Sequence, residues 1–327
     1  MGGLPASDLL MAGARSDVVG AAQHAMSDGV APDHPALLSG LQLLEDILAD
    51  NRHDLAITLV VAWAHIDIGL AWQAAVSEGD QPVKTQSVAA AYLDRASALL
   101  HRFDGQADDS TAMAAARCAL LSRLADPRRK VTTLYHRLIC LDPRDPRHLR
   151  ALGRQLLPNR FGTLDELDRQ ARRVADQTQG IWGQGGYAWV MSDAMSEDAG
   201  ACERVDPALL DAAIGDILAR RPCQRMVNLL TALCIRPRRK YGRDYPAARQ
   251  IADCGERIIR THLTELHPMV WGCVAFGLDN VMPHAASPRL AAQGRAIALE
   301  TLRAVFAEDL ARGHTVAFSA DGLDIGG

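Results

Sequence analysis

The sequence predicts an all-α protein made of antiparallel helix hairpins stacked side by side. Three features predict this class. Alanine and leucine dominate a chain of 327 residues in which aromatic side chains make up only 5%, a composition that favours closely packed helices over a β-sandwich. Apolar residues recur at helical spacing along most of the chain. Short turns rich in Pro, Gly and Asp separate these stretches, and no strand-like run lies between them.

The N-terminal part predicts a helix hairpin followed by one strongly apolar helix. The hairpin covers residues 7–28 and 35–50, and the second of these segments repeats Leu and Ile on one face. Residues 55–76 are apolar and long enough to cross a membrane. Because His65, Asp67 and Gln73 interrupt this segment and charges inside a membrane are costly, we expect a central helix covered all round by its neighbours, and no membrane partner.

The rest of the chain predicts further amphipathic helices up to residue 312. They are expected at 84–103, 110–124, 128–141, 146–157, 163–179, 187–197, 206–220, 223–235, 245–266, 268–281 and 288–312. Thr163 and Glu166 stand in capping-box spacing at one of these starts.

The domain organisation is predicted from the richest glycine stretch, Gly180 to Gly186, which is a candidate hinge or boundary. We therefore expect an N-terminal helical-repeat region over residues 1–180 and a C-terminal helical region over 181–312, continuous with the first. Residues 313–327 lose the helical period and are expected to form a loose tail.

A proline-punctuated turn joins two predicted helices between residues 134 and 163. Tyr135, Pro143 and the Leu152–Gly153 pair stand where tetratricopeptide repeats carry an aromatic residue, a terminal proline and the Leu-Gly of the next repeat. This junction resembles such repeats, although Ala119 replaces the glycine expected upstream. The resemblance implies a degenerate tetratricopeptide-like α-solenoid.

A second resemblance rests on residues 156–175 and 64–72. These segments are similar to a bacterial family of tetratricopeptide-like proteins of unknown function. The resemblance implies a helical fold and a bacterial origin, and it transfers no catalytic residue to this chain.

Composition limits the classes of function. The formal net charge of -4 argues against a surface built wholly for nucleic acid. The seven cysteines include no Cys-x-x-Cys pair and are expected to be reduced, mostly buried apolar residues. The first residues carry no basic group before the first apolar stretch, so we expect no secretory signal and a cytoplasmic location.

Two polar side chains interrupt the most apolar helix. His65 and Asp67 are two residues apart and therefore lie on different faces. They are either an acid/base pair or ligand contacts in a pocket with Trp63 and Trp72, or each makes a hydrogen bond to a neighbouring helix, Asp67 to an arginine.

One cluster of basic residues is a candidate binding site. It consists of Arg236, Arg238, Arg239, Lys240, Tyr241 and Arg243. Guanidinium groups suit phosphate and carboxylate groups, and a tyrosine ring can stack on a base, so the site would hold phosphate, nucleic acid or an acidic protein segment. The alternative is a solvated loop between helices.

Motifs for catalysis or cofactors are weak. His262, Glu265 and His267 lack the zincin and di-iron spacings, so we predict no metal site. No pattern places a base beside Cys254 or Cys273, and residues 183–186 lack the Gly-Lys-Ser/Thr ending of a phosphate loop, so no cofactor is predicted.

These observations predict a non-catalytic intracellular scaffold or adaptor that holds a protein or peptide on a helical surface. The main alternative is an enzyme or small-molecule-binding protein with a pocket around His65 and Asp67. A third reading, which is less favoured, is a regulator that touches nucleic acid through Arg236 to Arg243. The sequence does not indicate the oligomeric state.

Overall fold

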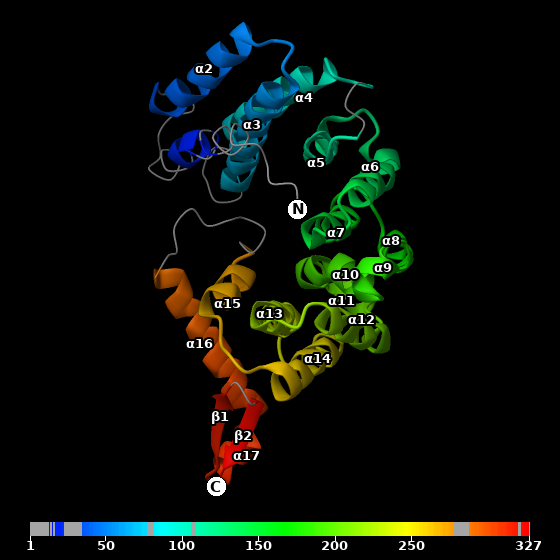
Figure 1. Ribbon diagram of the computed structural model, residues 1–327, viewed down its shortest axis with the longest axis vertical. Coiled ribbons are helices and arrows are strands. Elements are labelled where there is room, and N and C mark those ends of the chain that lie inside the picture. The colour runs from blue at the N-terminus through cyan, green and yellow to red at the C-terminus, as the bar shows by residue number, and fades with distance from the viewer. Residues whose placement is uncertain are drawn as a thin grey trace. The chain divides into compact units, whose positions relative to one another are not determined.

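A computed structural model of the protein describes residues 13, 15, 17–22, 35–76, 82–105, 109–277, 288–319 and 322–326. Over these residues the chain is helical except for one two-stranded sheet (Figure 1), which confirms the predicted all-α class. The chain divides into two compact units, residues 1–142 and 143–327. Of the helix predicted at 7–28, positions 13, 15 and 17–22 are described and are helical, and the other positions lie outside the described residues.

The first unit has the apolar helix α3 in its core. α3 packs against α4, α2 and α5. Its residues Leu55–Gln73 are the one described stretch that is long and apolar enough to cross a membrane, and 50% of that stretch is buried by the protein itself. Core helices pass the same test, so the stretch is weak evidence for a membrane span. The helices of this unit are α2 (Pro35–Asp50), α3 (Leu55–Val76), α4 (Pro82–His101), α5 (Thr111–Ala119), the 3-10 helix η1 (Leu121–Arg123) and α6 (Pro127–Leu141).

The second unit is arranged around α10, whose residues from Gly185 to Ser196 are all buried. α7, α8, α12 and α13 pack against it, while α13 pairs with α14 and α15 pairs with α16. Contact with α7 is especially close, because a Cβ atom at Gly153 would lie 1.9 Å from the carbonyl oxygen of Val190. The helices of this unit are α7 (Pro146–Gln155), α8 (Leu164–Gln177), α9 (Gln179–Trp182), α10 (Gly185–Glu197), α11 (Ala199–Glu203), α12 (Pro207–Arg220), α13 (Gln224–Tyr241), α14 (Pro246–His262), α15 (Pro268–Ala275), α16 (Pro288–Val305) and α17 (Ala307–Ala311).

The glycine-rich stretch before α10 lies inside the second unit and serves close packing. A Cβ atom at Gly185 would lie 2.4 Å from the Ile217 side chain, and one at Gly186 would lie 2.9 Å from the Cα of Ala175. Along the chain, the division between the two compact units falls in the proline turn after α6, between residues 142 and 143. Glycine content alone does not distinguish a hinge from a tight helix contact.

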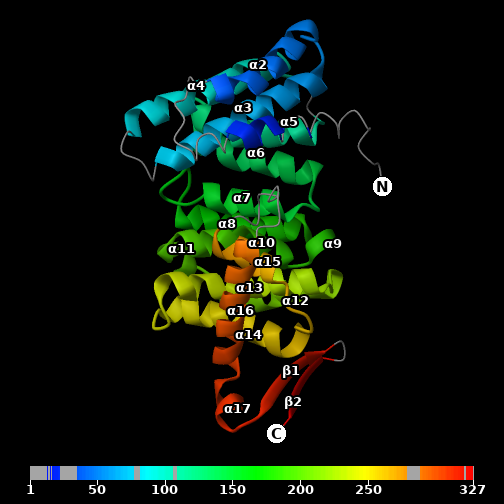
Figure 2. The same ribbon diagram turned by 90° about the vertical axis from the view of Figure 1, so that its left-hand side faces the viewer.

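The C-terminal residues form a β-hairpin where a loose tail was expected. Strands β1 (Thr315–Ser319) and β2 (Gly322–Gly326) pair antiparallel, with Thr315 opposite Gly326. Phe318 anchors the hairpin, because its ring packs edge-on against Phe306 at a centroid distance of 6.0 Å. Figure 2 shows α16 leading to α17 and this hairpin. The helix predicted at 288–312 is therefore two helices, α16 and α17, and residues 278–281 of the helix predicted at 268–281 lie outside the described residues.

Candidate anion-binding groove

The basic cluster lies on a helix. α13 continues through Pro237 to Tyr241, so the sequence prediction of a helix ending at 235 and a solvated loop was wrong. Proline has no backbone N–H, so Pro237 cannot donate a hydrogen bond within the helix. Its side chain is buried against other residues of the protein. The helix ends at Gly242, whose φ of +97° continues the chain in a conformation that favours glycine.

Two pockets lie along the C-terminal half of α13. Ile235 and Arg239 line both pockets, and we call the two neighbouring pockets together the basic groove. The first has a volume of about 320 Å³ and is lined by Ser196, Ala232, Ile235, Arg236, Arg239, Lys240, Trp271, Val274, Ala275 and Ile297. The second has a volume of about 310 Å³ and is lined by Ile235, Arg238, Arg239, Gly242, Arg243, Glu300, Thr301 and Ala304.

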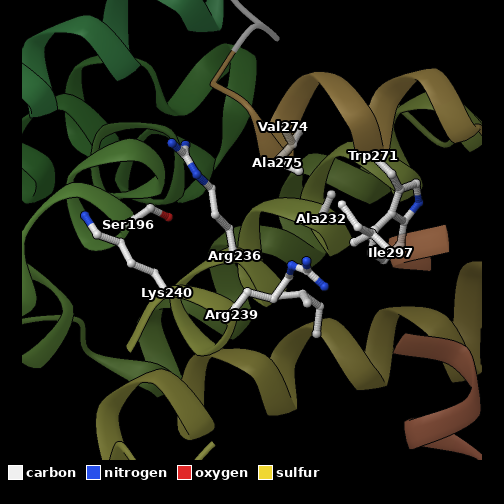
Figure 3. Close-up of a pocket in the computed structure, with 10 residues that line it drawn as sticks. Ser196, Ala232, Arg236, Arg239, Lys240, Trp271, Val274, Ala275 and Ile297 are labelled. Atoms are coloured by element: carbon white, nitrogen blue, oxygen red, sulfur yellow. The ribbon is translucent and has the colours of Figure 1, made fainter. Parts of the chain in front are cut away.

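The first pocket combines cations with an apolar wall. Figure 3 shows Arg236 and Lys240 on one side and Trp271 with Ile297 on the other. None of its described lining residues is an Asp, Glu, His or Cys. A ligand in this pocket would therefore meet positive charge and apolar surface together.

Three arginines of the groove are partly neutralised by acidic residues from other helices. Arg238 lies 2.6 Å from Glu256 of α14, and Arg239 lies 3.1 Å from Glu300 of α16. Arg243 lies 4.0 Å from the same Glu300. The two pairs with Glu300 are exposed and therefore weak, so a ligand carboxylate can compete for Arg239 and Arg243, whereas the Arg238–Glu256 pair is part-buried.

Lys240 lines the first pocket, whereas Tyr241 lies outside both pockets. The Lys240 ammonium group donates to the backbone carbonyl of Glu197 at 2.9 Å and meets no carboxylate among the ion pairs of the described residues. Tyr241 lines neither pocket, and its ring packs 5.5 Å from that of Tyr245. Burial raises the pKa of Tyr241 to about 12, so the phenol stays neutral. The sequence idea that Tyr241 stacks on a base does not fit this position.

Arg236 lies near the buried carboxylate of Asp193. Asp193 of α10 lies 3.7 Å from Arg236, 2.6 Å from Arg150 and 3.7 Å from Arg154. Burial alone would raise the pKa of Asp193, but the charges of these arginines and a hydrogen bond from Arg150 lower it, so the carboxylate is ionised at neutral pH.

A buried amide fixes the apolar wall. The Asn228 carbonyl oxygen accepts hydrogen bonds from the Trp271 indole and from the backbone N–H of His267, both at 2.9 Å. Its amide nitrogen donates to the backbone carbonyls of Gln224 and Glu265, both at 2.8 Å. The sequence analysis missed Asn228 and Asp193, although each stands within a short apolar run, between Val227 and Leu229 and between Met191 and Met195, where a polar group needs a buried partner.

His65 and Asp67 belong to two separate contacts in the first unit. His65 lies 2.7 Å from Glu45 of α2, and Arg95 of α4 donates to the same carboxylate at 2.6 Å. Hydrogen bonds from Arg95 and His65 lower the pKa of Glu45 to about 2. Asp67 accepts a hydrogen bond from Arg15 at 3.0 Å. Each residue therefore makes the interhelical bond of the second interpretation, and neither lines the basic groove.

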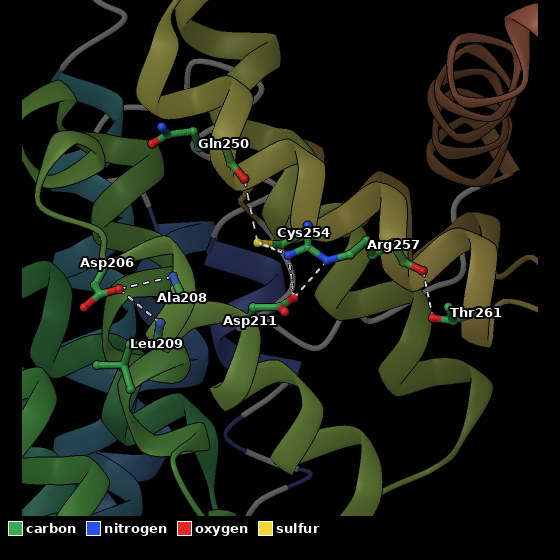
Figure 4. A network of polar contacts seen from close by, with 8 residues as sticks. All are labelled: Asp206, Ala208, Leu209, Asp211, Gln250, Cys254, Arg257 and Thr261. Carbon is green, nitrogen blue, oxygen red and sulfur yellow. Dashed lines mark hydrogen bonds and ion pairs between the residues drawn. The ribbon is translucent and has the colours of Figure 1, made fainter.

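The other reactive side chains are engaged in local contacts. The Cys254 thiol donates to the Gln250 carbonyl at 3.7 Å, while Arg257 donates to the Cys254 sulfur and to Asp211 (Figure 4). Burial raises the pKa of Cys254, and a protonated thiol is a poor nucleophile. Cys273 is also buried.

The histidines near the end of α14 do not converge. His267 lies 3.4 Å from Glu265 in the turn before α15, and the exposed His262 belongs to the last turn of α14. This arrangement fits the spacing argument that one helix cannot direct all three side chains at one ion.

No protein-family model matches the chain, and neither a curated protein nor a solved structure matches it. The geometry of the basic groove is therefore the basis for a functional assignment.

Proposed function

We propose that the protein is a non-catalytic binding protein that holds an acidic segment of a partner protein or peptide in the basic groove. The observation that carries this proposal is the lining of the first pocket, where three cations face an apolar wall and no described lining residue is acidic. Carboxylates suit guanidinium groups, and an apolar wall adds contact area for the neighbouring side chains of a peptide.

The helical architecture supports the same role. Helices adjacent in sequence pack as the pairs α3–α4, α13–α14 and α15–α16, and α13 also contacts α15. We infer a degenerate, tetratricopeptide-like solenoid in which such pairs present a rigid surface at low entropic cost. All seven cysteines are free, which supports a reducing, cytoplasmic location, and we propose a bacterial origin.

A peptide is favoured over nucleic acid for three reasons. The chain carries a net charge of -4, so only a local region attracts anions. Tyr241 packs against Tyr245 and lies outside both pockets. The wall that includes Trp271 and Ile297 suits an aliphatic side chain better than a sugar-phosphate backbone.

Binding of a fluorescein-labelled peptide of alternating glutamate and leucine, followed by anisotropy, tests the proposal. Replacing Arg236, Arg239 and Lys240 together with glutamine should weaken binding at least about tenfold, or ~1.4 kcal/mol. The wild-type affinity should also fall as salt is added.

A second variant with the same charge change is the control. Arg128, Arg129 and Lys130 are exposed on α6, and replacing all three with glutamine should leave the affinity unchanged. An equal loss in both variants would show that binding depends only on overall charge. Tighter binding of a single-stranded RNA than of the peptide would overturn the proposal in favour of nucleic acid.

A further inference from the structure

The basic groove has two sides of different chemistry that come from different helices. α13 supplies the cations of the first pocket, whereas α15 and α16 supply most of its apolar wall, including Trp271 and Ile297. Figure 3 shows the two sides facing each other across the pocket. An occupant that uses both sides must carry an apolar group and an anionic group close together.

The apolar side is rigid before any ligand arrives. Trp271 is fully buried, and its indole N–H donates to the buried Asn228 at 2.9 Å. A preformed wall spares the ligand the entropic cost of ordering side chains. The end of α15 adds Phe276, which directly follows the lining residues Val274 and Ala275 and is 53% exposed. We include this exposed ring in the proposed apolar contact.

The cationic side has one residue that is oriented and still has donors available. Arg236 is 23% exposed and lies 3.7 Å from Asp193, a separation beyond hydrogen-bond distance. Asp193 therefore attracts and orients the guanidinium group without taking all five of its N–H donors. The end of α15 comes near the same group, since a Cβ atom at Gly277 would lie 3.5 Å from Arg236 Nη2.

The length of the groove limits the length of its occupant. The cations from Arg236 to Arg243 span seven residues of helix and the turn after it, which corresponds to ~10 Å at the helical rise per residue. An extended peptide covers that distance with about three residues.

Resting on the proposed function, we propose that the groove recognises a short sequence pattern in the partner protein. An apolar side chain of the partner enters the first pocket against Ala275 and Ile297, which the buried Trp271 supports, and a carboxylate within about three residues pairs with Arg236. In the second pocket a further acidic residue would replace Glu300 as the partner of Arg243, an exposed pair 4.0 Å apart.

Three labelled peptides of equal length and the full-length protein test this pattern. The first peptide has one leucine flanked by glutamates, the second has serine in place of the leucine, and the third has glutamine in place of the glutamates. We expect the serine peptide to bind about tenfold more weakly than the leucine peptide, because it loses the burial of one aliphatic side chain. We expect the glutamine peptide to bind weakest.

Protein variants separate the apolar side from the cationic side. Ala275→Met fills the first pocket and should remove the preference for leucine over serine, while leaving salt-dependent binding of both peptides. Phe276→Ser changes an exposed side chain, so it should fold normally and reduce the same preference. Leu43→Ser is the matched control, because Leu43 is 60% exposed in the first unit and should have no effect.

The outcomes distinguish this inference from the proposed function. The leucine and serine peptides could bind equally well, and both more tightly than the glutamine peptide. In that case the predicted apolar contact is wrong and the groove recognises charge alone. If neither acidic peptide binds, the proposed function itself fails. A preference for leucine that survives both Ala275→Met and Phe276→Ser would place the apolar contact elsewhere on the protein.

Discussion

Replacing Asn228 with alanine should destabilise the second unit more than its small size suggests. This amide donates to the carbonyls of Gln224 and Glu265 and accepts from the N–H groups of His267 and Trp271, at distances of 2.8 to 2.9 Å. The bond to Gln224 lies within α13, and the other three tie α13 to the turn after α14 and to Trp271 of α15. This turn leads into α15 and thereby positions Trp271 in the wall of the basic groove.

The size of the loss in stability follows from the hydrogen-bonding groups that lose Asn228 as their partner. The indole N–H of Trp271 is buried and would lose its acceptor, which costs about 1–3 kcal/mol. The backbone N–H of His267 is only partly buried and would be satisfied in part by water. We therefore expect Asn228→Ala to lower the free energy of unfolding by about 3 kcal/mol.

Urea unfolding followed by circular dichroism, fitted with one transition for each compact unit, measures this loss. Gln224→Ala is the matched control. Gln224 also makes three hydrogen bonds to the same turn, with Thr264, Glu265 and His262, but it is only half-buried and water can replace them. We expect a loss of about 1 kcal/mol there. A loss for Asn228→Ala no larger than for Gln224→Ala would refute the burial argument.

Three further predictions concern stability. The pKa of Glu45 is about 2 instead of 4.5, so its interactions stabilise the first unit above pH 4.5 and are lost as the pH falls toward 2; Glu45→Gln should flatten this part of an acid-unfolding curve. Gly153→Ala places a Cβ 1.9 Å from the Val190 carbonyl oxygen and should lower the melting temperature, whereas Gly215→Ala meets open space and should raise helix stability by up to ~1 kcal/mol. Asp193→Ala removes the carboxylate 2.6 Å from a buried arginine and should cost about 3 kcal/mol in urea unfolding.

Each of these predictions has a result that contradicts it. An acid-unfolding curve unchanged by Glu45→Gln would mean that its ion pair contributes no stability. Equal melting temperatures for the two glycine variants would mean that α7 and α10 can move apart at little cost. A loss below about 1 kcal/mol for Asp193→Ala would show that the buried charges are hydrated in solution.

Local signals in the sequence predicted the helix boundaries around the proline turn well. α6 ends at Leu141 and α7 begins at Pro146, on either side of the proline turn. Asp145 caps α7 by accepting from the Arg147 N–H at 2.9 Å, and Thr163 accepts from the Glu166 N–H at 3.2 Å. Caps and prolines act within a few residues, so a single sequence carries this information.

The candidate site was predicted only in its residue types. The basic residues of α13 were identified, but the helix was expected to end at residue 235, before them, whereas α13 continues to Tyr241 with Pro237 inside it. The acidic partner of Arg239 is Glu300, which lies 61 residues away in sequence, and the apolar wall comes from α15 and α16. No local pattern indicates which distant helix will pack beside a given charge.

The burial of α10 from Gly185 to Ser196 has a consequence for how the second unit unfolds. Its backbone amides can reach solvent only when the surrounding helices α7, α8, α12 and α13 detach from it. Deuterium should therefore replace these amide protons at the rate of global unfolding of the unit, while the ends of outer helices such as α16 exchange through local fraying. Uniformly slow amide exchange over residues 188–195 would therefore show that the second unit unfolds cooperatively.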